Sequence, residues 1–476
     1  MWRISFSTLI ILIFLIWGML LWQWNTYVNQ SASTNGELNE KASQHISIET
    51  NHNQLQITQK VNGIIPGKTY TVLVPETISE WVCLNEDGTD CMSEEEDPFS
   101  IFTEESTLSL IYRIQLNNKS SAFLLHDWIV QLHNVHMKET TIELVDLSKR
   151  EGSWAAGLPL KAYKELNYID YYVFSGEERN ASIYWQPDPL FGKKYQDIQV
   201  YYSGEDRSLP SRSFELLNIL PASPVSAIVL SDLHPEAAGQ GLLVLSPGLS
   251  TEDMERKVVY QYFFNRFDPL SEEEIWLVDL LASAAMGKDA NTIKGNELIQ
   301  ELKGRLSSDE WTQFVQGVLD AETLSVQKLD EILGSLKGKQ TSYFSLNRNQ
   351  NSKLIPLYYL DLREILIKDT VLKDQHAILV RDELYFPFIE SMNNLGFNIH
   401  TLGSQDTILI NKDHNRYRFY VDQNIFIYNE EDYGLLENPL IMIDGRVYMK
   451  DKWLDSLFQV EITEGETQIK LSLLEK

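Results

Sequence analysis

The sequence is poor in cysteine, in histidine and in positive charge. It has two cysteines and nine histidines, and neither residue occurs from Pro235 to Gln375. A zinc site made of imidazole and thiolate ligands is therefore excluded from that stretch. The 40 Lys and Arg stand against 68 Asp and Glu, which gives a formal net charge of −28. This acidity argues against nucleic acid as a partner, because binding a polyphosphate requires Lys and Arg to displace counterions.

The chain is nevertheless long and apolar enough to fold. Its 476 residues exceed what one hydrophobic core usually serves, so we expect two to four folded domains. A hydrophobic content of 43% and an aromatic content of 11% exclude a disordered chain, because burial of this apolar surface offsets the conformational entropy lost on folding.

The N-terminus carries an uncharged apolar run at residues 4–24, ISFSTLIILIFLIWGMLLWQW. As a helix this run is about 31 Å long, enough to cross a bilayer. Arg3 precedes the run and the first base after it is Lys41. The positive-inside rule then places residues 1–3 in the cytoplasm and the body outside it. The sequence therefore predicts a single-pass transmembrane helix within residues 1–28 of a cell-membrane protein.

A cleaved signal peptide is the alternative for this segment. Small residues at positions 31–33 (Ser-Ala-Ser) suit a peptidase, although the apolar run is longer than is usual for a signal peptide. Both interpretations make the body extracytoplasmic. The polar residues 29–44 would be a tether.

The two cysteines, Cys83 and Cys91, flank a turn at Asp87-Gly88. In an oxidising compartment this spacing predicts a disulfide that closes a hairpin loop. Two unpaired thiols are the alternative. A metal site is not predicted, because zinc would need two further soft ligands nearby.

The hydrophobic pattern divides the body into three folded regions, so the predicted fold class is α+β with several domains. Residues 45–181 read as short strands of an antiparallel β-sandwich. Residues 182–345 form an α+β domain, with strands followed by a helical bundle from Ser250 to Gly334. The last region is a small α+β domain at 353–476. The expected strands are 55–61, 69–74, 108–116, 128–136, 141–145, 168–174, 198–202, 227–230 and 241–245.

Three segments in the helical region begin with a capping signature, in which a serine precedes a carboxylate by three residues. A fourth short helix is expected at 324–333. Residues 334–351 are rich in Gly, Ser and Asn and are expected to be a linker or a long loop. The capping segments are Ser250-Thr-Glu-Asp253, Ser271-Glu-Glu-Glu274 and Ser307-Ser-Asp-Glu310.

The C-terminal region contains an internal repeat. Residues 382–399 recur 63 residues later as 445–462, and both copies run turn, short strand with a tyrosine, helix, turn and strand. Such self-similarity indicates duplicated supersecondary units that share one core. A generic strand–helix repeat would also explain the pattern.

This repeat resembles the copper amine oxidase N-terminal-like domain of bacterial envelope proteins, often called a stalk domain. The second copy departs from the family's pattern, since Lys450 replaces a proline and Gln459 a glycine. The resemblance covers about 100 residues and implies a module that neither holds copper nor catalyses. The motif residues that carry it are Tyr385, Pro387 and Gly396 in the first copy and Pro439, Gly445, Arg446 and Tyr448 in the second.

The strand-then-helix region is faintly similar to gluzincin peptidases of the MA clan. In that family one helix bears His-Glu-x-x-His and a later helix bears a glutamate in Trp-Leu-x-Glu-Gly-Leu-Ala, and together they hold zinc. The best alignment places Tyr260, Gln261 and Phe264 on the first motif and Asp279 on the last ligand. These side chains cannot replace two imidazoles and a general base. The resemblance thus implies a degenerate pseudopeptidase, and a plain helical bundle is the alternative.

We therefore expect a non-catalytic, membrane-anchored protein of the cell envelope that binds a wall polymer or an envelope protein. No cofactor, metal or catalytic residue is predicted. Two alternatives remain open. One is an anchored extracytoplasmic hydrolase that works through paired carboxylates, which 68 acidic residues do not exclude. The other is a regulator of a membrane partner. Tyr and Trp are abundant, at 22 and 11 residues, and could line a sugar-binding surface, although such residues more often form cores.

Overall fold

The computed structural model describes residues 40–92, 99–116, 121–177, 180–203, 215–267, 270–402, 407–421, 423–435 and 437–474. The predicted transmembrane helix lies outside these residues, as does most of the predicted tether. In the described part of the chain, no helix is long and apolar enough to cross a membrane. The chain divides into two compact units, one within residues 1–214 and 223–254 and the other within 215–222 and 255–476. The mixed α+β fold with several domains is confirmed.

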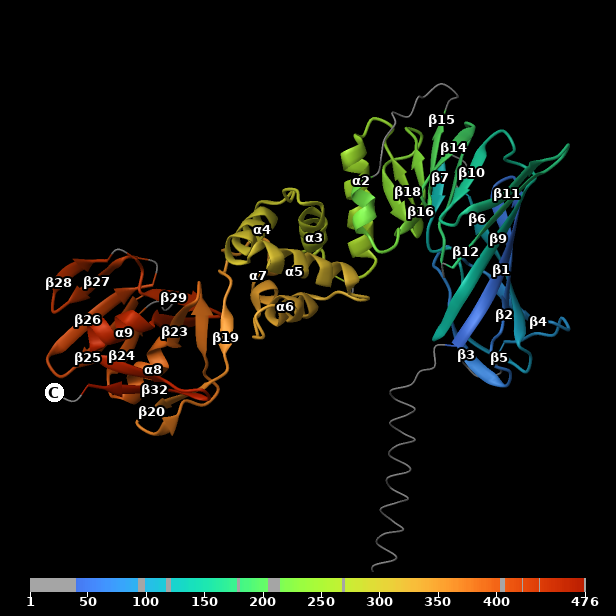
Figure 1. Ribbon diagram of the computed structural model, residues 1–476. Coiled ribbons are helices and arrows are strands. Elements are labelled where there is room, and N and C mark those ends of the chain that lie inside the picture. Colours follow the sequence, from blue (N-terminus) through green and yellow to red (C-terminus); the bar gives the residue numbers. More distant parts are fainter. Residues whose placement is uncertain are drawn as a thin grey trace, which may run out of the picture. The chain divides into compact units, whose positions relative to one another are not determined.

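The first unit is built on a seven-stranded sheet with the order β11-β12-β9-β1-β2-β6-β4 (Figure 1). Side chains alternate between buried and more exposed along β1, as expected for a sheet with one face on a core. β1 pairs antiparallel with β2 but parallel with β9, so the prediction of a purely antiparallel sandwich is wrong. The strands are β1 (Glu40–Asn51), β2 (Gln54–Asn62), β4 (Trp81–Asn85), β6 (Thr107–Gln115), β9 (Val135–Asp146), β11 (Leu160–Glu165) and β12 (Asp170–Gly176).

The first strand starts earlier than the sequence indicated. β1 begins at Glu40, inside the predicted tether at 29–44. Glu40 is 7% exposed, and its carboxylate accepts a hydrogen bond from the Tyr70 hydroxyl at 2.5 Å. The same carboxylate forms an ion pair with Lys68 at 3.1 Å. These long-range partners fix residues whose polar composition alone suggests a flexible segment.

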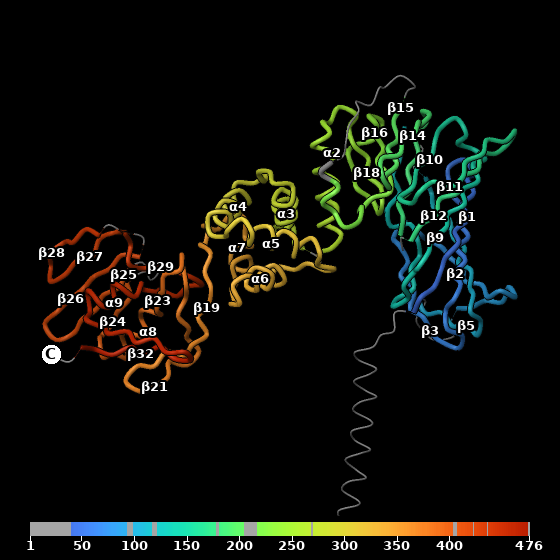
Figure 2. The backbone as a smooth tube through the Cα atoms, viewed as in Figure 1, coloured from blue at the N-terminus to red at the C-terminus, as the bar shows by residue number. Residues whose placement is uncertain are grey.

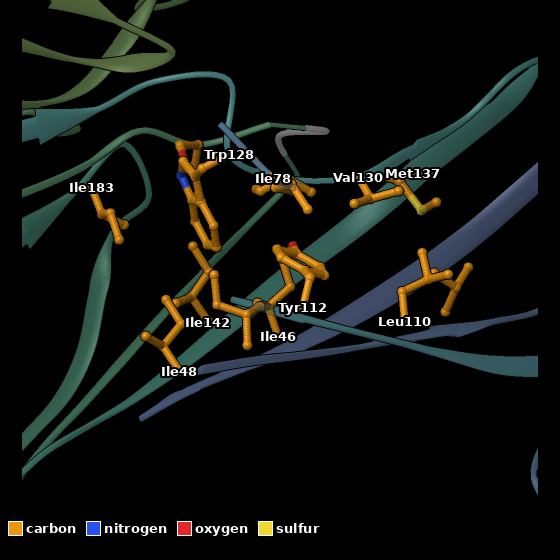
Figure 3. Packing of buried hydrophobic residues seen from close by; sticks show 14 of the residues in the cluster. Ile46, Ile48, Ile78, Leu110, Tyr112, Trp128, Val130, Met137, Ile142 and Ile183 are labelled. Atoms are coloured by element: carbon orange, nitrogen blue, oxygen red, sulfur yellow. The ribbon is translucent and has the colours of Figure 1, made fainter. Parts of the chain in front are cut away.

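The core of this sheet is covered by a buried loop and by a small sheet of order β5-β3-β8. Trp128, Ile129 and Val130 are each 1–2% exposed, and Figure 3 shows Trp128 and Val130 among side chains of β1, β6 and β9. Three consecutive buried side chains do not fit a half-buried strand, so the predicted strand 128–136 is wrong in its first part. The bounds here are β3 (Lys68–Leu73), β5 (Ser100–Thr103) and β8 (Gln131–Leu132).

The predicted disulfide between Cys83 and Cys91 is confirmed. Their Cα atoms lie 5.3 Å apart, and both residues are buried in the core of the first unit. The intervening loop turns at Gly88, whose φ of 83° lies in the left-handed region that glycine adopts without strain. The disulfide therefore fixes an exposed acidic hairpin loop to the core.

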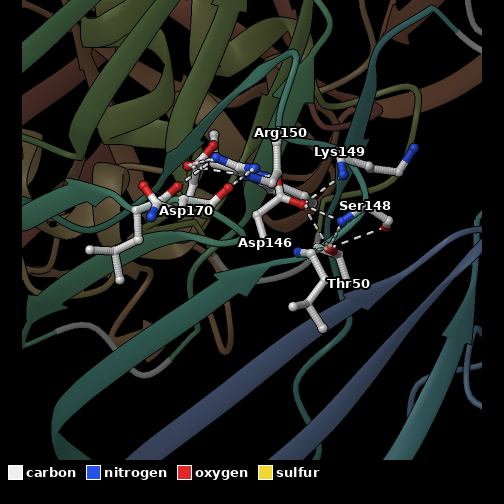
Figure 4. Close-up of polar contacts among 10 residues, drawn as sticks. Thr50, Asp146, Ser148, Lys149, Arg150 and Asp170 are labelled. Atoms are coloured by element: carbon white, nitrogen blue, oxygen red, sulfur yellow. Dashed lines mark hydrogen bonds and ion pairs between the residues drawn. The ribbon is translucent and has the colours of Figure 1, made fainter.

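A polar cluster joins the far ends of β1 and β9 (Figure 4). Asp146 is 1% exposed, and its carboxylate accepts hydrogen bonds at 2.7 Å from the Thr50 hydroxyl, the Trp154 indole and the Lys149 backbone N–H. A buried carboxylate is stable only with such partners. We assign this cluster to the stability of the fold.

Two further sheets complete the first unit, with the orders β10-β13-β7 and β14-β15-β16-β18-β17. β16 is parallel to β15 and to β18. Every residue of β18 is buried, as is typical of central parallel strands that are covered on both faces. The strands are β7 (Phe123–Leu125), β10 (Ser153–Ala156), β13 (Ile183–Gln186), β14 (Leu190–Tyr195), β15 (Ile198–Ser203), β16 (Val225–Leu230), β17 (Ala237–Gly239) and β18 (Gly241–Leu245).

The helical region carries the predicted caps. The Ser250 hydroxyl accepts the Asp253 N–H at 3.1 Å at the start of α2, and Ser307 and Glu310 form a capping box at α5. Ser271 and Glu274 cap a turn just before α3. The sequence did not predict α4, which Thr292 caps. The elements are η1 (Glu215–Ile219), α2 (Thr251–Phe264), α3 (Trp276–Met286), α4 (Ile293–Arg305), α5 (Ser308–Asp320), α6 (Val326–Ser335) and α7 (Tyr343–Asn347).

The predicted linker at 334–351 is instead part of the folded second unit, because it contains α7. Tyr343 and Phe344 are fully buried. The Asp330 carboxylate of α6 accepts hydrogen bonds from the backbone N–H groups of Phe344 and Ser345, at 2.7 and 3.1 Å. A carboxylate at this position satisfies the free N–H groups of the first turn, so one acidic residue fixes the segment.

The C-terminal region consists of three small sheets and two helices, whose backbone Figure 2 traces. Their orders are β19-β22-β23-β30-β29, β21-β20-β32-β31 and β24-β25-β26-β27-β28. The first copy of the repeat supplies β22 (Ala377–Val380), β23 (Glu383–Pro387), α8 (Phe388–Leu395), β24 (Asn398–Leu402) and β25 (Thr407–Lys412). The second supplies β29 (Leu440–Ile443), β30 (Arg446–Lys450), α9 (Asp451–Phe458), β31 (Val460–Glu464) and β32 (Gln468–Leu473). The remaining strands are β19 (Tyr359–Asp361), β20 (Glu364–Ile367), β21 (Thr370–Val371), β26 (Asn415–Tyr420), β27 (Ile425–Tyr428) and β28 (Glu431–Gly434).

The two copies pair with each other about a local twofold axis. β23 runs antiparallel to β30, with Phe386 opposite Met449 at the centre. On either side, Tyr385 pairs with Lys450 and Pro387 pairs with Tyr448. Because Tyr385 corresponds to Tyr448 and Pro387 to Lys450 in the repeat, exchanging the two copies turns one pair into the other. The duplication therefore builds one shared core.

Candidate functional site

Three of the positions aligned with the zinc-peptidase motif lie on α2. The rings of Tyr260 and Phe264 stack with their centroids 6.1 Å apart, and Phe264 is 44% exposed. The Gln261 side-chain amide donates a hydrogen bond to Asn265 Oδ1 at 2.6 Å. Burial raises the pKa of Tyr260, and the negative charge of Asp279 raises it further. Tyr260 therefore lies close enough to Asp279 for that charge to act on it.

The fourth position, Asp279 on α3, is 9% exposed and held by an ion pair. Its Oδ1 atom accepts hydrogen bonds from Arg256 Nη2 at 2.9 Å and from Asn291 Nδ2 at 2.8 Å. Its Oδ2 atom accepts the Asn291 backbone N–H at 2.8 Å. Arg256 Nη2 also donates to Ser283 Oγ at 2.6 Å. Both carboxylate oxygens of Asp279 are therefore engaged with side-chain and backbone donors.

This arrangement stabilises the fold and offers no set of metal ligands. The charge that neutralises Asp279 is the guanidinium of Arg256, which lies one turn before Tyr260 on α2. Within the described ranges, no group of three or more His, Cys, Asp or Glu residues is placed to hold a metal ion. Sequence reasoning found Asp279 but missed Arg256, because no motif marks an ion pair between helices.

The repeat motif residues of the C-terminal domain serve its turns and its central strand pair. Asp444 and Gly445, at φ values of 49° and 71°, form the two-residue turn between β29 and β30, as expected of a type I′ hairpin. Arg446 follows it, and its guanidinium donates to Gln375 Oε1 at 3.3 Å. Pro439 and Lys450 are joined by a backbone hydrogen bond of 3.1 Å.

The first copy uses related positions. Tyr385 and Pro387 lie in β23, opposite Lys450 and Tyr448 of β30. Gly396 ends α8 in a left-handed conformation, with a φ of 95°. These residues are spread over a buried strand pair and three turns, so they position the backbone and do not converge on one pocket.

A second candidate site, which the sequence motifs did not mark, is a cleft of about 690 Å³ in the C-terminal domain. Six aromatic residues line it, together with Lys412, Asp413, Asn415, Ser456 and Gln459. The aromatic residues are Phe397, Tyr417, Phe426, Tyr428, Tyr433 and Phe458. An aromatic cleft with a few polar groups is typical of a ligand-binding site.

The rings in this cleft contact one another. Tyr417 lies 4.8 Å from Tyr428 and 4.8 Å from Phe458, measured between ring centroids, and Phe426 stacks on Tyr433 at 5.4 Å. Burial raises the pKa of Tyr417, and the neighbouring Tyr428 contributes to the rise. The alternating aromatic residues of 417–433 are a sequence signal for this face, but they do not reveal whether helices cover it.

The C-terminal resemblance also appears in a comparison with known protein families. Residues 366–473 match the copper amine oxidase N-terminal domain family, and every repeat motif residue named above lies within this range. No curated protein matches the chain.

Among solved structures, an M1 zinc metallopeptidase from Deinococcus radiodurans matches at 12% identity with a TM-score of 0.47, covering 67% of this chain and 94% of that one. A mutant M1 zinc metallopeptidase from the same organism, bound to a Tyr-Ser-Ala substrate, matches at 13% identity with a TM-score of 0.46, covering 67% and 95%. Matches at this level assign neither an activity nor a residue role to this chain.

Proposed function

We propose that this chain is a non-catalytic, membrane-anchored protein of the cell envelope, and that its extracytoplasmic body binds a wall polymer or an envelope protein. The observation that carries the non-catalytic part is the environment of Asp279. Its two oxygens accept three hydrogen bonds, one of them from the ion-pair partner Arg256, whose side chain is 22% exposed. A carboxylate used in this way has little capacity left for a metal or a proton-transfer role.

The composition of the helical region supports the same conclusion. From Pro235 to Gln375 the chain contains no histidine and no cysteine. A zinc peptidase needs protein ligands of these types together with an open coordination position for water. A protein that keeps a large body without these ligands is expected to act by binding.

The binding part rests on the C-terminal domain, which matches the copper amine oxidase N-terminal domain family and carries the aromatic cleft. The membrane part rests on residues 4–24, whose length and lack of charge suit a spanning helix. Placement of the body outside the cytoplasm follows from Arg3 before this run and the absence of a base until Lys41.

The hydrolase alternative gains no support from Asp330, a buried carboxylate whose pKa is shifted in the direction that suits a catalytic acid. Burial raises the pKa of Asp330, as it would for a general acid. Its oxygens, however, accept the N–H groups of Phe344 and Ser345 and the Ser345 hydroxyl. These bonds make Asp330 the cap of α7, so we propose no second function.

The test uses the purified full chain in mild detergent. We expect plasma mass spectrometry to find far less than one zinc ion per chain. We also expect no chelator-sensitive hydrolysis of casein or of aminoacyl fluorogenic substrates. In parallel, the chain is incubated with purified cell wall and with solubilised membrane proteins, and we expect retention by one of them. Stoichiometric zinc lost together with proteolysis on chelation would overturn the proposal, as would hydrolysis without any retention.

A variant of Asp279 tests whether this residue serves the stability of the fold and not the binding of a partner. Asp279→Asn weakens the ion pair with Arg256 but keeps the shape of the side chain. We expect it to open its helices more readily in hydrogen exchange and to retain its partner as wild type does. For the anchor, the full chain should stay in membranes through alkaline carbonate extraction, whereas a chain lacking residues 1–28 should not.

A further inference from the structure

The sheet β24-β25-β26-β27-β28 is wider than the helices that cover it. One face carries Ile408 and Ile410 on β25, both fully buried, and Phe419 on β26, which is 1% exposed. Towards the edge, burial decreases along the same face, to 6% exposure at Phe426 and 41% at Tyr433. The outer strands therefore present an aromatic face beyond the helical cover, and this uncovered part forms the cleft.

The tyrosine rings of this face are held in place before any ligand arrives. The Tyr428 hydroxyl donates to Asn415 Oδ1 at 2.9 Å, and the Tyr433 hydroxyl donates to Glu431 Oε2 at 3.0 Å. The Tyr417 hydroxyl donates to the Leu457 carbonyl at 3.3 Å. Because hydroxyls and neighbouring rings fix these side chains, little conformational entropy is lost when a ligand stacks on them.

The polar part of the lining is balanced in charge. It has one base, Lys412, one acid, Asp413, and three uncharged side chains, Asn415, Ser456 and Gln459. The Lys412 ammonium lies 4.3 Å from the ring centroid of Phe397, so it is already engaged in a cation–π contact. A net charge of −28 on the chain also disfavours an anionic polymer. The lining therefore suits an uncharged ligand with many hydroxyl or amide groups and apolar faces for stacking.

We infer that this cleft binds an uncharged pyranose oligosaccharide, with sugar rings stacked on Tyr433 and Tyr428 and with Asn415 and Gln459 hydrogen-bonding to its polar groups. A pyranose chain has both required properties, because its C–H faces stack on aromatic rings and its edges carry hydrogen-bonding groups. The inference rests on the proposed function and specifies its wall-polymer branch.

The experiment is titration calorimetry of the full chain with the β-1,4-linked hexamer of N-acetylglucosamine and with the corresponding hexamer of glucose. We expect at least one of them to bind. Tyr433→Ala should weaken that binding about tenfold, because it removes one exposed stacking ring. Tyr433→Phe, which keeps the ring and loses only the bond to Glu431, should bind within about twofold of wild type.

Tyr163→Ala is the control for a lost surface tyrosine, since Tyr163 on β11 is 51% exposed and belongs to the first unit. It should leave affinity unchanged, and near-ultraviolet circular dichroism should show all variants folded. The inference is overturned if neither hexamer binds, if Tyr433→Ala binds as wild type does, or if a proline-rich peptide binds the cleft in their place. Retention of the same full chain by purified wall or by membrane proteins would then leave the proposed function standing. Retention by neither, together with no binding of either hexamer, would reject the two together.

Discussion

The two copies of the C-terminal repeat share a backbone but not the residues that would favour it locally. The first copy enters its helix through Pro387 (φ −54°) and leaves it through Gly396 (φ 95°). The second has Lys450 (φ −61°) and Gln459 (φ 57°) at the same places. Glycine adopts the left-handed conformation at the helix end without strain, whereas glutamine is disfavoured there. Proline fixes the φ at the helix start, which lysine adopts as one of several allowed values. The backbone is therefore set by the shared core and the pairing of β23 with β30.

The copies also differ in what extends them. In the first copy, β25 is continued by β26, β27 and β28, while in the second copy β32 pairs with β20. The aromatic cleft lies where the first extension runs beyond the helices and α9 ends. Duplication thus supplied a shared core, and the longer extension of the first copy supplied most of the aromatic residues that line the cleft.

The largest expected effect tests the ends of the two helices. Phe458 is 5% exposed and packs its ring within 6.0 Å of those of Phe397, Tyr417 and Phe419, while its counterpart Leu395 is 1% exposed. We expect Phe458→Ala to lower the free energy of opening of the domain by about 4 kcal/mol and Leu395→Ala by about 3 kcal/mol. Hydrogen exchange of C-terminal peptides in the full chain measures both values.

The cleft separates these two variants. Phe458 lines it and Leu395 does not, so only Phe458→Ala should also reduce saccharide binding under conditions where the domain stays folded. Equal loss of binding in both variants would mean that the cleft depends on overall stability and not on the ring of Phe458.

The next effect concerns the lysine that replaces proline. Lys450 has a side chain only 5% exposed, and its ammonium pairs with Glu383 at 2.5 Å and with Glu437 at 3.2 Å. We expect Lys450→Met to cost about 1–2 kcal/mol, because the stem still packs and the two partly exposed carboxylates become hydrated. The control is Lys452→Met, since Lys452 also pairs with Glu437 but is 52% exposed, and a change below about 0.5 kcal/mol is expected. Equal costs for the two variants would contradict the role assigned to Lys450.

Local signals in the sequence predicted the two copies of the repeat but not the cleft. The spacing of 63 residues, the tyrosines at 385 and 448, and the turn at Asp444-Gly445 locate both strand–helix units. The cleft was not predictable in this way. Alternation marks Tyr417, Phe419, Phe426 and Tyr428 as one face, but exposure of that face depends on where α9 ends in space.

The same limit applies to the helical region. Its caps at Ser250 and Ser307 are local and were predicted, whereas the Arg256–Asp279 ion pair joins residues on different helices and was not. Composition was misleading at 334–351, because Asp330 caps α7 from outside the segment. Long-range hydrogen bonds of this kind leave no periodic trace in the sequence.

A smaller effect, of opposite sign in the two copies, is expected at the residues that end the helices. Gly396→Ala places a side chain at a φ of 95° and should destabilise the domain by about 1 kcal/mol. Gln459→Gly relieves a left-handed glutamine and should stabilise it by about 0.5 kcal/mol. Hydrogen exchange of the peptides containing α8 and α9 gives both values, and the same sign in both copies would show that their helix ends are not equivalent.

The smallest effect is a pH dependence confined to the second copy. Hydrogen bonds from Lys452 and then Lys450 hold the pKa of Glu437 below its ordinary value, despite some opposing desolvation. Burial alone would lower the pKa of Lys450, but its bonds to Glu383 and Glu437 outweigh this and raise it. The contribution of Glu437 is thus present above the ordinary pKa of a glutamate and is lost as pH falls through the lower folded value. That of Lys450 is lost only above its ordinary alkaline range.

At neutral pH both groups therefore stabilise the start of α9, and acid should weaken it through Glu437 first. We expect the difference in opening free energy between wild type and Glu437→Gln, measured by hydrogen exchange corrected for intrinsic rates, to be larger at pH 7 than at pH 3. Glu390→Gln in the first turn of α8 is the matched control, because the first copy has Pro387 at the position of Lys450 and so lacks this cation. If both variants lose their difference from wild type equally in acid, the dependence belongs to the whole domain and the two copies are electrostatically alike.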